Sequence, residues 1–232
     1  MEQFARTISV IGLPAFQRLQ AAHVAVIGVG GVGAACAEAL VRSGVGRITL
    51  MDHDTVAITN LNRQLIALHS TLGQQKTAVC AQRLLDINPD LKLTALPRFY
   101  GEDTRELLDY KGLHAVADCV DTLSAKLLLA REALLHDVFL LSCMGAGNRL
   151  DSTRLQFADI YQTSVCPLAR RMRKACREQG IPALRVLFST EEPVKAVTSL
   201  EGGRHAPGSV AYVPPVAGMM MAGEIIRHLT GS

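Results

Sequence analysis

The chain has 232 residues, of which 49% are hydrophobic and 19% are charged. This composition excludes a generally disordered chain, and it is typical of a protein whose strands are buried on both faces. The net charge of +3 is too small to indicate a nucleic-acid-binding protein by itself. The length is compatible with one domain over residues 1–232.

The cysteines are scattered and no C-x-x-C pair occurs, so neither a structural zinc site nor a disulfide framework is indicated. There are six of them: Cys36, Cys80, Cys119, Cys143, Cys166 and Cys176. No secretory signal is recognisable at the start of the sequence. The most apolar late stretch, 213–226, is interrupted by two prolines and a glutamate. We therefore expect a cytoplasmic protein without stable membrane insertion.

β-type runs alternate with helical patterns in the first two thirds of the chain, as in a parallel sheet with crossover helices. This alternation predicts an α/β, Rossmann-like, doubly wound and mostly parallel sheet. The expected strands are 23–27, 47–51, 91–96, 114–119 and 138–143, and the expected helices are 34–43, 76–87, 102–108 and 124–136.

The strict alternation stops after residue 150, which divides the chain into a nucleotide-binding half, 1–150, and an extension, 151–232. We expect a loop, a basic helix over 168–179 and a last helix in the extension. Short strands at 185–188 and 210–212 are expected to extend the sheet as C-terminal antiparallel strands. The glycine- and proline-containing segment 191–208 is predicted to be a mobile loop.

A glycine-rich turn follows the first expected strand and precedes a helix. Its glycines are Gly28, Gly30, Gly31 and Gly33, in the spacing G-x-G-x-x-G. Such a turn lets the backbone approach phosphate at the positive end of a helix. Asp52, at the end of the second strand, is placed to bind ribose hydroxyls. These features alone suit NAD as well as ATP, and the turn could also serve packing only.

A dense polar group after the second strand favours ATP over a dinucleotide. It consists of Asp54, Asn60, Asn62, Arg63 and Lys76. Guanidinium and ammonium groups stabilise the charge that develops on phosphate when a carboxylate is adenylated. A bound Mg²⁺ would share this task, and Asp121, after the fourth strand, is the candidate metal ligand. No G-x-x-x-x-G-K-[ST] motif is present, so the site is not a P-loop.

The spaced motifs resemble the ubiquitin-activating-like, ThiF/MoeB-type adenylyltransferase superfamily. They are the glycine turn, D-H-D at 52–54, N-L-N-R-Q at 60–64, G-x-x-K at 73–76 and D-C-V-D at 118–121. Later segments resemble the tRNA threonylcarbamoyladenosine dehydratases within this superfamily. Those segments are 142–148, 159–169 and 207–215, together with Arg6-Thr7 near the start.

The resemblance implies an enzyme that uses ATP to cyclise threonylcarbamoyladenosine beside the tRNA anticodon, with its threonyl carboxylate activated as an adenylate. It implies that the four glycines and Asp52 hold the nucleotide and that Asn60, Arg63 and Lys76 face its phosphates. It also implies a homodimer in which Arg6 reaches the partner's site. A sulfur-relay protein partner is left open by the resemblance.

Three other interpretations remain open at this stage. The first is an adenylyltransferase for a ubiquitin-like sulfur-carrier protein, although the C-x-x-C pairs that such enzymes usually carry are absent. The second is a nicotinamide-dependent oxidoreductase, which would leave Arg63, Lys76 and Asp121 unexplained. The third is a catalytically silent nucleotide-binding subunit.

Cyclisation does not require an enzyme nucleophile, because the attacking ureido atom belongs to the same substrate as the activated carboxylate. Cys143 and Cys166 lie in family-like segments, and a chemical role for either is left open, since reactivity depends on exposure and surroundings.

The expected basic helix concentrates five cations within eight positions. They are Arg170, Arg171, Arg173, Lys174 and Arg177. Such a cluster can bind the phosphates of a tRNA, although a solvated helix face is the common alternative. With the tRNA substrate that the resemblance implies, we interpret this helix as a tRNA-binding surface.

Overall fold

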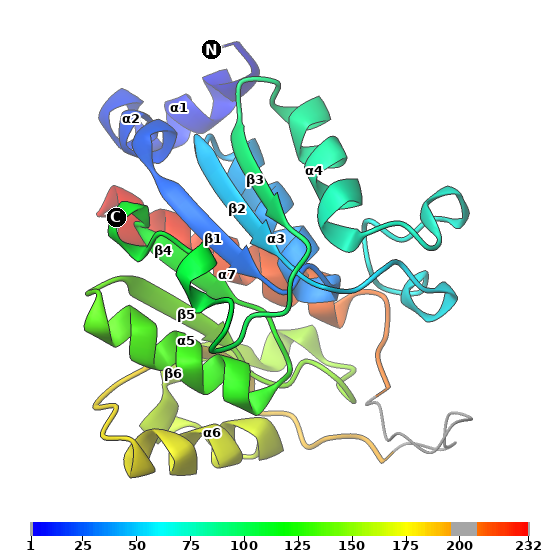
Figure 1. Cartoon of the computed structure of the whole chain (residues 1–232), viewed down its shortest axis with the longest axis vertical. Coiled ribbons are helices and arrows are strands. Elements are labelled where there is room, and N and C mark those ends of the chain that lie inside the picture. The colour runs from blue at the N-terminus through cyan, green and yellow to red at the C-terminus, as the bar shows by residue number, and fades with distance from the viewer. Residues whose placement is uncertain (1, 196–207, 232) are drawn as a thin grey trace.

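A seven-stranded, mostly parallel sheet forms the centre of the computed structural model, which describes residues 2–195 and 208–231 (Figure 1). The strand order is β3-β2-β1-β4-β5-β7-β6. All neighbouring pairs are parallel except β6 and β7. The strands are β1 His23–Ile27, β2 Arg47–Met51, β3 Lys92–Leu96, β4 Ala115–Asp118, β5 Phe139–Cys143, β6 Leu155–Asp159 and β7 Arg185–Ser189.

Helices cover both faces of the sheet and bury a separate hydrophobic core on each (Figure 1). The helices are α1 Ala5–Ile11, α2 Leu13–Ala21, α3 Gly31–Arg42, α4 Lys76–Ile87, α5 Leu123–Leu135, α6 Pro167–Glu178 and α7 Val213–Thr230. Val24 and Val26 of β1 point into the core beneath α3, α4 and α7. Ala25 and Ile27 point into the core beneath α5 and α6. This alternation explains why the central strands are apolar throughout.

The predicted doubly wound sheet with a C-terminal antiparallel pair is confirmed, but one of its strands lies elsewhere in the sequence. The predicted strand at 210–212 is wrong, because this segment is a bend that leads directly into α7. Pro214 lies in the first turn of that helix, where a missing backbone N–H costs nothing. The antiparallel partner of β7 is β6, in a segment that was predicted to be a loop.

The helix predicted over 102–108 is also wrong, since only a short 3-10 turn, Arg105–Leu107, forms there. The hydroxyl of Thr104 accepts from the backbone N–H of Gly101 at 2.9 Å and donates to the carbonyl of Phe99 at 2.6 Å. Side-chain bonds of this kind compete with the hydrogen bonds of an α-helix.

Most of the predicted mobile loop 191–208, namely 196–207, lies outside the described residues. Its beginning is bound to the rest of the chain, because the Glu191 carboxylate accepts from the backbone N–H groups of Leu150 and Asp151 at 3.0 Å. Within the described ranges, no helix has both the length and the apolar character needed to span a membrane.

A buried ion pair joins α5 to the carboxyl ends of β4 and β5. Lys126 and Asp118 are both completely buried, and the Lys126 Nζ lies 3.1 and 3.0 Å from the two Asp118 carboxylate oxygens. The same ammonium group donates to the Ser142 hydroxyl at 3.2 Å and to the carbonyl of Cys143 at 2.6 Å. Asp118 also accepts from the backbone N–H of Val120 at 3.2 Å. The network therefore fixes the start of the loop that follows β4.

Removing the cation from this network is predicted to destabilise the fold. Lys126→Met keeps much of the side-chain volume but leaves the Asp118 carboxylate buried without its counterion, which costs about 3–5 kcal/mol. The free energy of unfolding, measured by urea denaturation, should fall by that amount, whereas Lys111→Met at an exposed position should leave it nearly unchanged. A Lys126→Met protein as stable as the Lys111→Met protein would contradict this account.

Candidate functional site

A cavity of about 370 Å³ opens at the carboxyl ends of the central strands. The chain runs outward from β1 to β2 and β3 on one side and to β4 and β5 on the other, so the strand order reverses between β1 and β4. Loops after these strands diverge at such a point and leave a crevice where open α/β sheets bind ligands. The cavity lies in this crevice and is lined by the segments that follow β1, β2, β3, β4 and β5.

The glycine-rich turn forms the floor of the cavity. Gly28, Gly30 and Gly31 line it. Gly28 has a φ of +87°, and a Cβ atom there would lie 2.9 Å from the carbonyl group of Cys119. A Cβ on Gly33, one turn into α3, would lie only 1.8 Å from the Gly28 carbonyl oxygen. The turn therefore depends on glycine at both positions, and it presents the uncapped N-terminus of α3 to the cavity.

Asp52 links the end of β2 to the glycine turn. One of its carboxylate oxygens accepts from the backbone N–H of Val29 at 2.6 Å, and the other accepts from that of Asp54 at 2.8 Å. Next to it, the imidazole of His53 makes an edge-on contact with the half-exposed ring of Phe99, with 5.2 Å between the ring centroids. Both rings line the same end of the cavity as Asp52.

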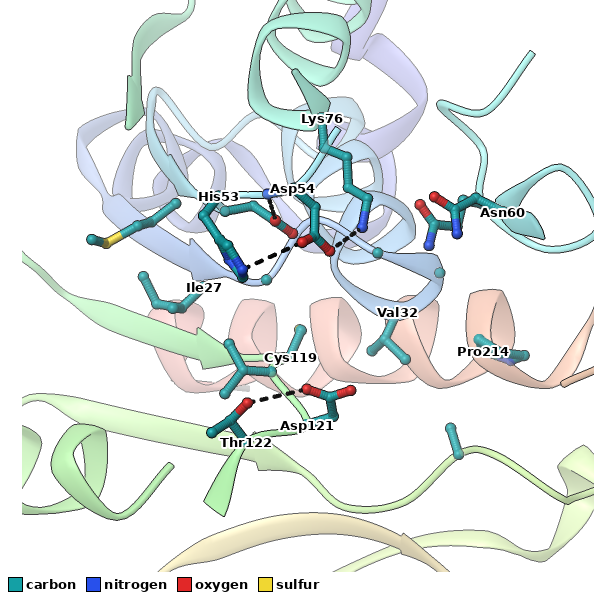
Figure 2. A pocket seen from close by; sticks show the side chains of 18 of the residues that line it. Ile27, Val32, His53, Asp54, Asn60, Lys76, Cys119, Asp121, Thr122 and Pro214 are labelled. Atoms are coloured by element: carbon teal, nitrogen blue, oxygen red, sulfur yellow. Dashed lines mark hydrogen bonds and ion pairs between the residues drawn. The ribbon is translucent and has the colours of Figure 1, made fainter. Parts of the chain in front are cut away.

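Lys76 is the first residue of α4, and its ammonium group is directed into the cavity (Figure 2). Its Nζ lies 2.6 Å from the Asp54 Oδ2, while the Lys76 side chain is only 7% exposed. The Asp54 carboxylate is half exposed and also lies 3.4 Å from the His53 Nε2. The buried cation is thus held by a partner that water and ligands can reach.

The predicted phosphate-side residues lie in the loop between β2 and α4, and they differ in what they contact. Asn60 is buried and lines the cavity, and its Oδ1 accepts from the backbone N–H of Ala57 at 3.0 Å. Arg63 lines the cavity and donates to the carbonyl of Thr59 and to the Asn62 Oδ1, both at 2.9 Å. Partial burial lowers the pKa of Arg63. Asn62 itself does not line the cavity.

Asp121 lies on the opposite side of the cavity, in the loop after β4 (Figure 2). Among the described residues, its side chain has one hydrogen bond, which the Thr122 hydroxyl donates at 3.4 Å. The carboxylates of Asp52 and Asp54 form, with His53, a compact group of potential ligands, but backbone N–H groups and Lys76 already engage these carboxylates. The Asp121 carboxylate therefore best fits a hard cation such as Mg²⁺.

Several side chains of the cavity were not singled out from the sequence. Five of them are His53, Gln64, Arg98, Phe99 and Ser209. His53, Gln64 and Ser209 lie inside the motifs that carry the resemblance, but nothing in the sequence indicated a role for each of them individually. Arg98 and Phe99 follow the carboxyl end of β3, and the rule that all parallel strands end at one edge could have found them.

The two cysteines for which a chemical role was left open are both buried. Cys143 is 4% exposed at the end of β5, and burial raises the pKa of its thiol. Cys166 is 3% exposed at the start of α6. Neither lines the cavity, and a buried thiol cannot be reached by a substrate there. Cys119 does line it, but a hydrogen bond with Cys36 and burial raise its pKa well above the ordinary value.

Two sets of predicted residues lie away from the cavity. Arg6 is exposed on α1, near the end of the sheet where β1 begins (Figure 1). The cations of α6 do not all face solvent, because Arg173 is partly buried and donates to the Thr163 carbonyl at 2.8 Å. Arg177 lies over the ring of Tyr161, 5.3 Å from its centroid. The remaining three, Arg170, Arg171 and Lys174, are exposed.

Comparison with known proteins places the chain among adenylating enzymes. Residues 4–232 match the model of the ThiF family. The chain is 44% identical to the tRNA threonylcarbamoyladenosine dehydratase of Bacillus subtilis over 99% of this chain and 95% of that protein. It is 30% identical to a sulfur carrier protein adenylyltransferase of Thermus thermophilus, over 95% of this chain and 74% of that protein.

The structure is similar to solved structures of the tRNA N6-threonylcarbamoyladenosine dehydratase of Escherichia coli. The TM-score is 0.92 for its complex with AMP and 0.91 for its complex with ATP, each at 30% identity, covering 99% of this chain and 94% of the other. The match runs through both the glycine-rich half and the C-terminal extension. The chain therefore belongs to the ThiF family.

Proposed function

We propose that the chain is an ATP-dependent tRNA threonylcarbamoyladenosine dehydratase. It would cyclise N6-threonylcarbamoyladenosine next to the anticodon by adenylating the threonyl carboxylate. One observation carries the proposal: Arg63 and Lys76 converge with the glycine turn and Asp121 on one cavity, in a chain whose whole length resembles dehydratases. The ATP and AMP complexes of the Escherichia coli relative support a nucleotide in this cavity.

The two ends of the cavity suit the two ends of ATP. Asp52 would accept hydrogen bonds from the ribose, and His53 and Phe99 offer aromatic surfaces near it for the base. The glycine turn and the N-terminus of α3 would receive the phosphates together with Arg63 and Lys76. Because phosphate competes with Asp54 for the Lys76 ammonium group, we infer that the 2.6 Å ion pair loosens when ATP binds.

The chemistry begins with attack of a carboxylate oxygen on the α-phosphorus of ATP. The bond to pyrophosphate breaks, and the carboxylate becomes a mixed anhydride with AMP. Arg63 and Lys76 would stabilise the charge that develops on the phosphate oxygens. An atom of the ureido group, carried by the same substrate, then attacks the activated carbonyl carbon, and AMP leaves with the former carboxylate oxygen. The products are the cyclised nucleoside, AMP and pyrophosphate.

A divalent cation would be held by the Asp121 carboxylate. Mg²⁺ bound there would offset negative charge on the triphosphate and its leaving group. Asp121 faces the side of the cavity that carries Lys76, so a cation and an ammonium group would approach the phosphates from opposite sides (Figure 2).

A homodimer would bring Arg6 to the phosphate site of the partner subunit. This arginine is exposed and lies far from the cavity of its own chain, so it can act at a phosphate site only in a second copy. A tRNA substrate would place the protein in the cytoplasm. The proposed chemistry does not itself require a sulfur-relay partner.

The proposal is tested by removing the ammonium group at the phosphate site. The wild-type protein, incubated with ATP, Mg²⁺ and tRNA that carries threonylcarbamoyladenosine, should yield the cyclised nucleoside in mass analysis of the digested tRNA. Lys76→Ala should lower the rate by about 10²–10³, the usual effect of losing one group that stabilises transition-state charge. Lys92→Ala, at an exposed position on β3, is the matched control and should retain the wild-type rate.

Two results would contradict the proposal. One is a Lys76→Ala rate within threefold of that of Lys92→Ala. The other is a wild-type protein that leaves the tRNA unchanged but exchanges pyrophosphate into ATP only with a small protein that ends in Gly-Gly, which would favour the alternative sulfur-carrier adenylyltransferase.

We further propose that α6 contacts the tRNA backbone. Helix α6 packs beside α5 on one face of the sheet, with Met172 and Cys176 completely buried. Its opposite face carries Arg170, Arg171 and Lys174, of which only Lys174 has an anionic neighbour among the described residues, Glu178 at 3.7 Å. Exposed cations without counterions bind phosphate most favourably, because their charge is not already neutralised. Arg173 and Arg177 support the helix by the contacts described above.

Charge reversal on this face should weaken tRNA binding. We expect Arg170→Glu/Arg171→Glu to raise the Kd for tRNA at least tenfold and to flatten its dependence on salt, because fewer counterions are released on binding. The control Arg47→Glu/Lys92→Glu changes the net charge equally at the opposite edge of the sheet. Equal Kd values for the two double variants, measured by filter binding at several salt concentrations, would rule out a specific role for α6.

A further inference from the structure

Ser209, in the segment that precedes α7, lies in the wall of the cavity. Its Oγ atom is buried, and none of the residues that the structure describes forms a hydrogen bond with it. Buried hydroxyl groups in folded proteins nearly always have a partner, so an unpaired one in the wall of a binding site calls for a ligand atom.

Two hydrogen bonds connect the backbone of Ser209 to Arg63, one of the predicted phosphate-side residues. The side-chain nitrogen of Asn62 donates to the Ser209 carbonyl at 2.8 Å. The Asn62 side-chain oxygen accepts from the Arg63 guanidinium at 2.9 Å. One amide group therefore bridges the Ser209 backbone and the guanidinium group of Arg63.

A second connection ties the same segment to the loop after β5. The backbone N–H of Asn148 donates to the carbonyl of Gly208 at 2.7 Å, and Ala146 and Gly147 of this loop line the cavity. Ser209 thus belongs to a wall formed by the segment before α7 and the loop after β5, and this wall carries none of the groups assigned to ATP.

The geometry points to Ser209 as the residue that binds the acyl substrate, the carboxylate group that is to be adenylated, beside the α-phosphate. This inference rests on the proposed function. A carboxylate that approaches a phosphate is repelled by it, and a neutral O–H donor at the point of contact can orient the carboxylate without competing for the triphosphate as a cation would. Asn62 acts as a positioning residue, since it holds the Ser209 backbone relative to Arg63.

This assignment explains why Asn62 is placed in a phosphate-binding loop without lining the cavity. Its amide uses both functional atoms, one toward Arg63 and one toward Ser209, so that the acyl site and the phosphate site share one support. The nucleotide-binding half and the C-terminal extension would in this way present their two substrates in a fixed relative position.

Ser209→Ala, with Ser70→Ala at an exposed position as the control, separates acyl binding from ATP binding. At saturating ATP, Ser209→Ala should lower kcat/KM for threonylcarbamoyladenosine-containing tRNA about tenfold to a hundredfold, the effect expected for losing a hydrogen bond to a charged group. The Kd for ATP and Mg²⁺, measured by calorimetry without tRNA, should change less than twofold. Thermal unfolding of each variant verifies that the fold is intact.

Two outcomes for Ser209→Ala would overturn the inference. Unchanged kcat/KM for tRNA would show that the hydroxyl does not bind the acyl group, and an equally large rise in the Kd for ATP would assign the hydroxyl to the triphosphate. Wild-type protein in the same assays separates this failure from that of the proposed function. If wild type does not cyclise the tRNA, the function is wrong and the inference fails with it.

The positioning role of Asn62 is tested by combining substitutions. Asn62→Ala should also lower kcat/KM for tRNA, and Asn62→Ala/Ser209→Ala should lose little more than Ser209→Ala alone, because both substitutions act through the same hydroxyl. Losses that add in full would show that Asn62 acts independently of Ser209.

Discussion

The close approach of β1 and β4 at their carboxyl ends is the constraint on which the rest of the site depends. Gly28 turns away from β1 against the carbonyl of Cys119, so closely that no side chain fits between them. The reversal of strand order at this point opens the crevice, and the glycine turn aims α3 at it. The buried pair of Lys126 and Asp118 stabilises the β4 side of this junction, because the Lys126 ammonium group also donates to the carbonyl of Cys143 at the end of β5.

The electrostatics of the cavity follow from which charges are already paired. Both carboxylate oxygens of Asp52 accept hydrogen bonds from backbone N–H groups. Asp52 therefore stabilises the loops and still lines the cavity. Lys76 is buried but bound to a half-exposed carboxylate, which makes its cation available to phosphate. Asp121 has no cationic partner among the described residues. Lys76 thus places a cation on the α4 side of the cavity, and Asp121 places a carboxylate without a cationic partner among the described residues on the β4 side.

The sequence allowed most of the sheet and most of the cavity to be predicted, because parallel strands and glycine turns have strong local patterns. A strand was predicted at 210–212 and a loop where β6 forms, because a short edge strand differs little in composition from a bend. Only the pairing with a neighbouring strand distinguishes the two. Ser209 was missed because its importance comes from contacts between segments far apart in the chain. The unsatisfied hydroxyl of Ser209 is a property of packing, which no spacing of residues reveals.

Adenylation of the substrate carboxylate is the central claim of this account, and following the oxygen atoms tests it most directly. The wild-type protein would be incubated with ATP and with tRNA whose threonylcarbamoyladenosine carries ¹⁸O in both carboxylate oxygens. Mass analysis should find one ¹⁸O atom in the released AMP, because the oxygen that attacks phosphorus leaves with it. AMP without ¹⁸O, or cyclised product formed together with ADP and phosphate, would contradict the account.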